Sequence, residues 1–163
     1  EQLMENAGLR LDNRLVLDVG CNIGMVIAEY LKKGAKWCHG WDMPQIVHHS
    51  EKLLLASGCT RFSLTGGMIH GTQRLEDDIP EFMKPDLEGC VISYLAVRAH
   101  VGWLESLGRI PWSYIIYEGH QGDDFEADMA EFRQLVNFEI IGATSYTDGL
   151  SNERDIALLA QKV

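Results

Sequence analysis

The stretch Leu15-Val16-Leu17-Asp18-Val19-Gly20-Cys21-Asn22-Ile23-Gly24 decides the fold. Its first half is an apolar run with the length of a buried strand. Its second half is a turn with two glycines that leads into a segment of helical period. Glycine suits this turn because a ligand can lie over the end of a strand only where side chains leave room and backbone N–H groups point outward. The stretch predicts a ligand site beside a parallel strand, where Asp18 can accept a hydrogen bond from an ammonium group.

Apolar runs of similar length recur along the chain and alternate with amphipathic segments. This alternation is typical of an α/β fold in which helices cover both faces of a mostly parallel sheet. Each run is bounded by Gly, Pro or a charged residue, as strands commonly are. The runs predict strands at Leu15–Val19, Trp37–Trp41, Arg61–Thr65, Cys90–Tyr94 and Tyr114–Tyr117.

Two segments carry apolar residues at helical spacing, and both stripes are expected to pack against the sheet. One stripe, after Gly122, consists of Phe125, Met129, Phe132 and Val136. The aspartates that precede it favour a helix N-terminus, and they are Asp123 and Asp124. The other stripe follows the fourth strand, ends before Pro111, and consists of Val97, Val101, Leu104 and Gly108.

The C-terminal part has a different pattern. Two segments rich in β-forming residues, Phe138–Tyr146 and Arg154–Gln161, flank a polar turn that contains Asp148, Gly149, Ser151 and Asn152. Such a pair predicts an antiparallel hairpin. The hairpin would complete a sheet of seven strands.

The composition indicates one compact domain over residues 1–163. The 46% of hydrophobic residues can form one substantial core, and the chain is too short for two ordinary domains. The net charge is −10, and the densest basic group, Lys32, Lys33 and Lys36, is interpreted as a solvated helix end. A nucleic-acid partner is therefore less expected than a small molecule or a protein.

The location is expected to be cytoplasmic. Cys21, Cys38, Cys59 and Cys90 are scattered, without a C-x-x-C pair or a signal peptide, which favours free thiols. No apolar run approaches the roughly 20 residues that span a bilayer, so no membrane partner is expected. The sequence opens at Glu1 rather than Met, which suits a piece of a longer protein with an N-terminal extension or a further domain.

A second acidic residue ends the next predicted strand, in Gly40-Trp41-Asp42. A carboxylate there lies beside the turn at Gly20 and can accept hydrogen bonds from both hydroxyls of a ribose. Other nucleotide-binding folds share a glycine turn followed by such an acid, so these residues alone leave a dinucleotide-binding enzyme open. The dehydrogenase pattern G-x-G-x-x-G is absent, because Asn22 and Ile23 break it.

The run Val16-Leu17-Asp18-Val19-Gly20-Cys21-Asn22-Ile23-Gly24 resembles the first motif of class I S-adenosylmethionine-dependent methyltransferases, in a variant with Asn for Gly. Gly40-Trp41-Asp42 resembles the second motif, and the reversed last strand of the family matches the predicted hairpin. The resemblance covers nearly the whole chain. It implies a Rossmann-like three-layer αβα sandwich, with S-adenosylmethionine as cofactor and S-adenosylhomocysteine as product. It also implies that Asp42 holds the ribose and that the methionine moiety lies against Asp18, Gly20, Cys21, Asn22 and Gly24.

The sequence departs from the family in two places. Many members carry an acid after the third strand for the adenine amino group, whereas Leu64-Thr65-Gly66-Gly67-Met68 has none. Adenine is therefore expected to contact the backbone around Gly67 and Met68, with Trp41 or Met43 over its face. Many members also begin the fourth strand with Asp, where this chain has Cys90. The donor's amine is then expected to rely on Asp18 and a carbonyl near Tyr94.

The acceptor pocket is expected at the ends of the fourth and fifth strands, lined by Tyr94, His100, Glu118 and His120. Glu118 ends an apolar strand, where a carboxylate can supply a base or hold a substrate hydroxyl or amine. The plainer alternatives are that Tyr94 is a half-buried sheet residue and His100 an ordinary helix histidine. His48 and His49 are interpreted as a solvated helix face. No metal is expected, because capping explains the aspartates after His120.

The acceptor itself stays unknown, with a small molecule or protein favoured over nucleic acid. No Asn/Asp/Ser-Pro-Pro-aromatic run follows the fourth strand and no Cys precedes Pro. The chain therefore does not resemble methylators of exocyclic amines or of cytosine C5 in nucleic acids. Two other functions stay open: a non-catalytic cofactor-binding or scaffold module of the same fold and, less favoured, an NAD-linked oxidoreductase.

Overall fold

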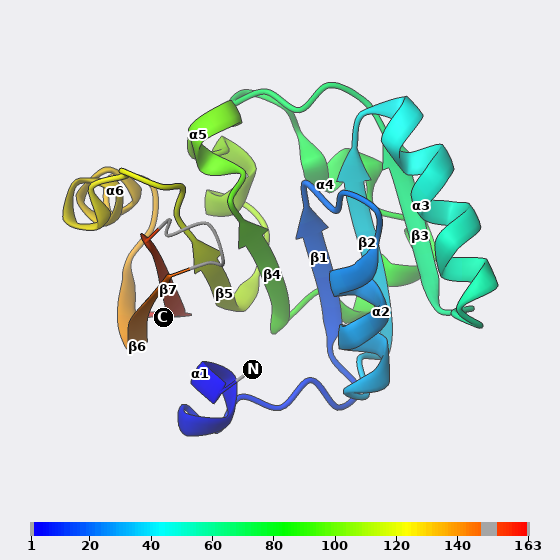
Figure 1. The fold of residues 1–163 in the computed structure, drawn as a ribbon, viewed down its shortest axis with the longest axis horizontal. Helices are drawn as coiled ribbons and strands as arrows, with labels where there is room; N and C mark the ends of the chain where they lie inside the picture. The colour runs from blue at the N-terminus through cyan, green and yellow to red at the C-terminus, as the bar shows by residue number, and fades with distance from the viewer. Residues whose placement is uncertain (1, 148–152, 163) are drawn as a thin grey trace.

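A seven-stranded sheet forms the centre of the computed structural model, which describes residues 2–147 and 153–162. The strands lie in the order β3-β2-β1-β4-β5-β7-β6, which places β3 and β6 at the two edges (Figure 1). The first five strands pair in parallel, and β7 lies antiparallel between β5 and β6. The strands are β1 (Leu15–Val19), β2 (Trp37–Asp42), β3 (Phe62–Gly66), β4 (Cys90–Leu95), β5 (Trp112–Glu118), β6 (Phe138–Thr147) and β7 (Glu153–Gln161).

This arrangement confirms the predicted α/β fold, a mostly parallel sheet with an antiparallel C-terminal hairpin. The strand starts and ends agree closely with the apolar runs, because burial on both faces makes each central strand almost wholly apolar. The polar turn predicted through Asp148, Gly149, Ser151 and Asn152 lies outside the described residues.

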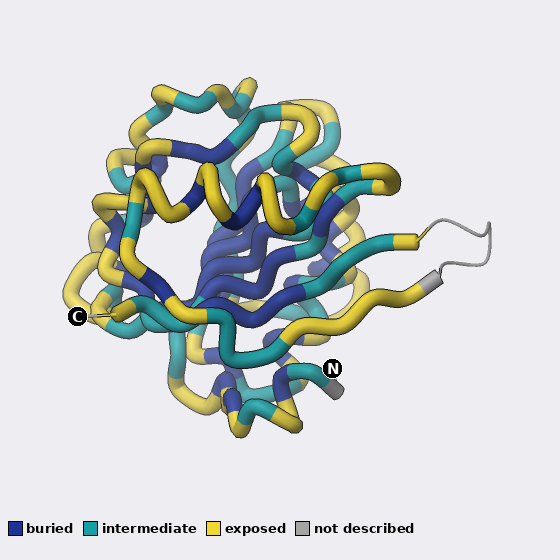
Figure 2. The backbone as a smooth tube through the Cα atoms, turned by 90° about the vertical axis from the view of Figure 1, so that its left-hand side faces the viewer, coloured by how far each residue is buried: buried dark blue, intermediate teal, exposed yellow. Residues whose placement is uncertain are grey.

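The core consists of two apolar clusters, one on each face of the sheet. β1 shows the separation, since Leu15, Leu17 and Val19 belong to one cluster and Val16 to the other. Side chains of a strand alternate between faces, so an apolar run of this kind stabilises both layers, by about 1.5–3 kcal/mol for each fully buried large side chain. In Figure 2 the buried strands run through the middle, between more exposed helices.

Helices cover both faces. The cluster that contains Val16 packs under α1 (Gln2–Asn6), α2 (Met25–Lys32) and α3 (Pro44–Ala56). The cluster that contains Leu17 packs under shorter elements and their flanking loops. These are α4 (Leu75–Asp78), α5 (Arg98–Val101), α6 (Phe125–Phe132) and the 3-10 helices η1 (Glu81–Asp86) and η2 (Glu105–Gly108). The result is the expected three-layer sandwich.

The single helix predicted over residues 97–108 is wrong. α5 ends after one turn at Gly102, whose φ of 71° leaves the right-handed helical region. The next residue, Trp103, is buried and its indole N–H donates to the carbonyl of Asp128 at 3.0 Å. Val97, Val101 and Leu104 do pack against the core as expected, so the spacing identified buried residues but not the backbone between them.

Other local predictions are confirmed. Asp124 caps α6, where its side chain accepts from the backbone N–H of Ala127 at 3.1 Å. His48 and His49 are exposed on α3. Within residues 2–147 and 153–162, no helix is both long and apolar enough to pass through a membrane.

Candidate functional site

A cleft of about 730 Å³ opens at the carboxyl ends of β1, β2, β3 and β4. Parallel sheets bind ligands at this edge, and the cleft extends to the loop after β5 and to β7. Its lining comes from loops that follow different strands. The described residues that line it are Gly20, Asn22, Asp42, Met43, Ile46, Gly67, Met68, Ile69, Leu95, Ala96, Val97, His100, Val101, His120 and Arg154.

The turn after β1 requires glycine for two separate reasons. Gly20 has a φ of 75°, which residues with a side chain rarely adopt, and a Cβ there would lie 2.8 Å from Cγ2 of Val97. The backbone N–H groups of Gly20 and Cys21 both donate to the carbonyl of Trp41, at 2.9 and 3.0 Å. The turn is therefore fixed to the end of β2, close to the loop after β4.

Asp42 lies in the cleft wall with its carboxylate held in place. Oδ2 accepts from the backbone N–H of Asn22 at 2.8 Å, and Oδ1 accepts from that of Met43 at 2.7 Å. An ionised carboxylate has about four acceptor positions, so these two bonds orient it and leave capacity for a ligand. Asn22 itself has a φ of 47°, in the left-handed region that Asn tolerates better than most residues.

Asp18 lies beneath the turn rather than in the cleft lining. It is 3% exposed, and its Oδ2 has no hydrogen-bond partner among the described residues. Burial raises the pKa of Asp18 to about 7; a hydrogen bond with Ser93 opposes the shift and the nearby charge of Asp42 adds to it. Ser93 also accepts from the hydroxyl of Tyr30 at 3.3 Å. The end of β1 thus contains a buried carboxyl group with an unused acceptor.

Cys21 and Gly24 support the turn from behind. Cys21 is 3% exposed and packs where Gly40 leaves space, since a Cβ on Gly40 would lie 2.8 Å from Cβ of Cys21. Gly24 begins α2 with a φ of 81°, and a Cβ there would lie 2.9 Å from the side chain of Leu54. Neither residue is among the described residues that line the cleft, and both shape the backbone around it; their predicted contact with a ligand stays a prediction.

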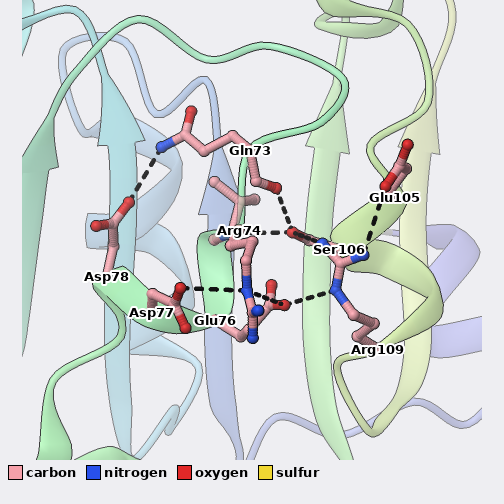
Figure 3. A network of polar contacts seen from close by, with 9 residues as sticks. Gln73, Arg74, Glu76, Asp77, Asp78, Glu105, Ser106 and Arg109 are labelled. Carbon is pink, nitrogen blue, oxygen red and sulfur yellow. Dashed lines mark hydrogen bonds and ion pairs between the residues drawn. The ribbon is translucent and has the colours of Figure 1, made fainter.

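The loop after β3 supplies Gly67, Met68 and Ile69 to the cleft. At its start the N–H of Gly67 donates to the carbonyl of Asp42 at 2.9 Å. At its far end the hydroxyl of Ser106 on η2 donates to the carbonyl of Gln73 at 2.6 Å and accepts from the N–H of Leu75 at 2.9 Å (Figure 3).

An ion pair reinforces the attachment of this loop to η2. Arg109 Nε lies 2.6 Å from Oε1 of Glu76 on α4, and Arg109 Nη1 lies 3.6 Å from Oε2 of Glu105 (Figure 3). Both ends of the loop are therefore fixed. Met68 between them is 72% exposed, so the loop presents an apolar side chain at the mouth of the cleft.

His100 and His120 line the cleft on the other side, beyond β4 and β5. Their rings meet edge to face, with centroids 5.0 Å apart and an interplanar angle of 88°. Leu95, Ala96 and Val97 lie beside them. The structure thus brings two of the predicted acceptor residues together.

Tyr94 was predicted in the same pocket, and this is wrong. Its side chain is fully buried, it stacks on Trp103 with centroids 5.3 Å apart, and its hydroxyl donates to the carbonyl of Gly102. Burial raises the pKa of this phenol above its ordinary value. Trp41 is likewise 1% exposed in the core, so of the two residues expected over the adenine only Met43 is available.

Glu118 is occupied by neighbouring strands rather than lining the cleft. Its Oε1 accepts from Arg154 Nη1 at 2.8 Å and from the hydroxyl of Tyr146 at 3.2 Å. This links β5, β7 and β6 at their ends. Arg154 lines the cleft, so Glu118 contributes to the cleft by holding Arg154 in place.

The helix that carries His100 is fixed by a charged network. Arg98 Nη1 lies 2.8 Å from Oδ1 of Asp128 and Arg98 Nη2 lies 2.7 Å from Oε2 of Glu131, both on α6. The hydroxyl of Tyr117 donates to the other oxygen of Asp128 at 2.5 Å. α5 and α6 therefore form one unit, although α5 buries no residue of its own.

Sequence reasoning missed the cleft residues Ile46, Ile69, Leu95, Ala96, Val97, Val101 and Arg154. Position gave a usable signal for one group, because residues 95–97 directly follow an apolar strand. Arg154 gave none, since its place depends on β7 lying between β5 and β6. Among the residues that the structure describes, no group of three His, Cys, Asp or Glu residues is arranged to hold a metal ion.

Neither a protein-family model nor a curated protein matches this sequence. Solved structures do match the fold. Magnesium protoporphyrin IX methyltransferase from Synechocystis, solved with bound S-adenosylmethionine, superposes with a TM-score of 0.69 at 15% identity, over 99% of this chain and 75% of that one. A putative tRNA (m1A22) methyltransferase from Streptococcus pneumoniae, in complex with S-adenosylmethionine, gives 0.70 at 17% identity, over 98% and 72%.

A third similar structure is an rRNA methylase from Streptococcus thermophilus, with a TM-score of 0.66 at 14% identity, over 96% of this chain and 92% of that one. All three similarities extend over nearly the whole of this chain. The chain therefore has the fold of the class I S-adenosylmethionine-dependent methyltransferases, a Rossmann-like α/β sandwich.

Proposed function

We propose that this protein is an S-adenosylmethionine-dependent methyltransferase that binds its donor in the cleft at the ends of β1, β2 and β3. One observation carries the proposal: the carboxylate of Asp42 is oriented in the cleft wall by Asn22 and Met43, beside the glycine turn after β1. An acid fixed there suits a ribose, because vicinal hydroxyls donate to the two oxygens of one carboxylate.

The remaining donor contacts follow from what lines each part of the cleft. The turn at Gly20 and Asn22 would hold the methionine moiety. Met43, Ile46, Met68 and Ile69 form an apolar pair of walls suited to the faces of an adenine. Its polar edge would contact backbone near Gly67.

The donor's amine fits the end of β4 together with Asp18. Leu95 and Ala96 line the cleft, whereas Asp18 lies beneath the turn with an acceptor oxygen that no described residue uses. An unsatisfied buried carboxyl oxygen costs about 1–3 kcal/mol, so a cationic ligand near it would recover part of that cost.

When bound, the donor would supply a methyl group attached to a sulfonium sulfur. A nucleophile attacks such a methyl carbon directly and the thioether leaves. The protein's share of such a reaction is mainly alignment, since it holds two reactants in contact and away from water. The pinned loops around the cleft provide this alignment: the loop after β3 is held by Ser106 and α5 is held by Asp128.

Calorimetry tests the donor assignment directly. Titration with S-adenosylmethionine and with S-adenosylhomocysteine should give saturable binding, and titration with NADH under the same conditions should give none. Asp42→Asn keeps the size of the side chain and should weaken binding of both. Saturable binding of NADH alone would replace this proposal with the NAD-linked oxidoreductase.

A non-catalytic module with the same fold is the second candidate, and a specific observation favours it. Tyr94 and Glu118, two groups expected to act on an acceptor, are respectively buried and ion-paired. Labelled-methyl transfer into fractionated extract separates the two functions. Donor binding with no labelled product in any fraction would identify the module.

A further inference from the structure

We propose that the acceptor is a small, uncharged molecule with a hydroxyl group, whose proton is received by His100 or His120. The proposal rests on the proposed function and names the substrate class of the same cleft. It is drawn from the composition, the charges and the ring geometry of the wall beyond β4 and β5.

The first argument is that this wall is largely apolar. Leu95, Ala96, Val97 and Val101 line it, together with the two imidazoles and one arginine. Apolar linings favour apolar ligand surface, because removing that surface from water is favourable. A few polar groups then fix the orientation of the ligand, and here these are the imidazoles.

The second argument is the charge of the wall. Arg154 is the one cationic residue among the described residues that line the cleft, and its Nη1 lies 2.8 Å from Oε1 of Glu118. The two side chains are 24% and 14% exposed, so the pair is partly shielded from water and presents little net charge. Neither an anionic nor a cationic acceptor gains a strong counter-charge there.

The third argument concerns polyanions. The densest basic group consists of Lys32, Lys33 and Lys36, between α2 and β2. It lies at the amino end of β2, whereas the cleft lies at the carboxyl ends of the parallel strands. The net charge of −10 repels a nucleic acid at long range, and phosphate contacts normally supply most of its affinity. The described cleft wall offers no basic track that would compensate.

The fourth argument is the imidazole pair. The edge of one ring meets the face of the other, with centroids 5.0 Å apart and an interplanar angle of 88°. α5 holds His100 in this position because Arg98 is bound by Asp128 and Glu131. The pair therefore presents two imidazoles in the cleft, and each neutral imidazole has a ring nitrogen that can accept a proton.

The step balances as follows. The lone pair of the acceptor's hydroxyl oxygen forms the bond to the methyl carbon, and the electron pair of the methyl–sulfur bond leaves with sulfur, which becomes a neutral thioether. The acceptor's proton passes to a ring nitrogen of His100 or His120. No oxidant or metal is needed.

The deciding experiment sorts labelled product by charge and size. The protein is incubated with donor carrying a tritiated methyl group and with extract of the organism that encodes the chain. Label extracted into organic solvent at neutral pH, and not retained by either ion exchanger, supports the proposal. Label in RNA, in protein or in an ion-exchanger-bound small molecule overturns the acceptor class while leaving the proposed function intact. Absence of label in every fraction, with donor binding intact, overturns both.

Two histidine variants test the proton acceptor on the labelled fraction. His100→Gln or His120→Gln, whichever removes the proton acceptor, should lower kcat at least tenfold with donor affinity unchanged. His49→Gln, on the exposed face of α3, is the matched control and should keep the wild-type kcat. A wild-type kcat in both cleft variants would remove the imidazoles from the step.

A matched pair of probes tests the same wall without turnover. 2-Naphthol and naphthalene-2-sulfonate share an aromatic body and differ in charge. Titration of each into the protein with S-adenosylhomocysteine, followed through the imidazole NMR signals, should give tighter binding of the naphthol and shifts confined to His100 and His120. Equal or tighter binding of the sulfonate at these rings contradicts an uncharged acceptor.

Discussion

The backbone N–H of Asn22 donates to Oδ2 of Asp42 at 2.8 Å, across a separation of 20 residues. This bond joins the turn after β1 to the end of β2. The two motifs that stood out in the sequence are thus parts of one structure, because the peptide group that shapes the turn also aims the carboxylate into the cleft.

Replacement of Asp42 should weaken donor binding. Asp42→Asn removes the charge and should raise the dissociation constant of S-adenosylmethionine at least tenfold, since charge-assisted hydrogen bonds contribute about 1.5–3 kcal/mol. Calorimetry measures the constant and circular dichroism confirms the fold. Asp12→Asn, an exposed residue paired with Arg10, is the control and should bind normally. An unchanged constant in folded Asp42→Asn would falsify the ribose contact.

Gly20→Ala should destabilise the protein for two separable reasons. A side chain at a φ of 75° costs about 1–2 kcal/mol, and its Cβ would lie 2.8 Å from Val97. The sequence alone suggested that a side chain here would meet the ligand; the structure shows that it first meets Val97.

A pair of controls separates the two reasons. Gly58→Ala has a φ of 76° and no atom within 4 Å of the new Cβ, so its loss of stability in chemical denaturation measures the backbone cost alone. Gly20→Ala should lose more than Gly58→Ala, and Val97→Ala in the same chain should reduce the difference. If the two single variants lose equal stability, the close approach to Val97 is not real.

Asp18 should make the ligand-free protein less stable as pH rises from about 4 to about 7. Burial raises its pKa from 3.8 to about 7, so the folded state binds more protons than the unfolded state in this interval. The stability of the protonated form is fully present below the pKa of Asp18 in the unfolded chain and is lost as pH rises through its pKa in the folded protein. A pKa shift of this size corresponds to about 4 kcal/mol in the free energy of unfolding. Asp18→Asn should therefore be more stable than wild type at pH 8, as denaturant titration would measure. Equal stability of the two proteins there would show that Asp18 is not desolvated.

His39 should have the opposite effect. Its ring lies between the hydroxyls of Ser63 and Thr65, at 2.7 and 3.3 Å, and burial lowers its pKa from 6.5 to about 4. The buried neutral imidazole contributes its full stability at pH values above 6.5, the pKa of His39 in the unfolded chain. This stability is lost as pH falls from 6.5 toward 4, the pKa in the folded protein.

His39→Gln measures this effect. In a plot of unfolding free energy against pH, the variant should lose less stability than wild type as pH falls from 6.5 toward 4. The full difference between the two proteins is about 3 kcal/mol. His48→Gln on the exposed face of α3 should leave the curve unchanged. A wild-type acid slope in His39→Gln would assign the acid loss to other groups.

The fold was largely predictable from the sequence. β1, β2, β4 and β5 are largely buried runs, and such runs can be recognised in a sequence because most of their residues are apolar. Asp42 and Gly20 could be assigned to the cleft for the same reason: each directly follows such a run, and parallel strands end at one edge of the sheet.

The rest depends on contacts that spacing does not reveal. Gly102 breaks the helix predicted over residues 97–108, and only its φ and the burial of Trp103 show that the chain turns there. Tyr94 was expected in the acceptor pocket because it ends a strand, yet its hydroxyl donates to the carbonyl of Gly102. Arg154 could not be predicted as a cleft residue, because strand order rather than sequence order sets its neighbours.

That strand order also governs how the chain can fold while it is being synthesised. β5 pairs with β7 and not with β6, and among the described strands β6 pairs with β7 alone. Until β7 has left the ribosome, the outer edge of β5 has no partner and β6 has no sheet to join. Nascent chains that have already completed β1 to β5 must keep an open edge, which is the kind of surface that recruits other strands. Among the described strands, the one that closes the gap between the parallel sheet and its edge is thus the last in chain order.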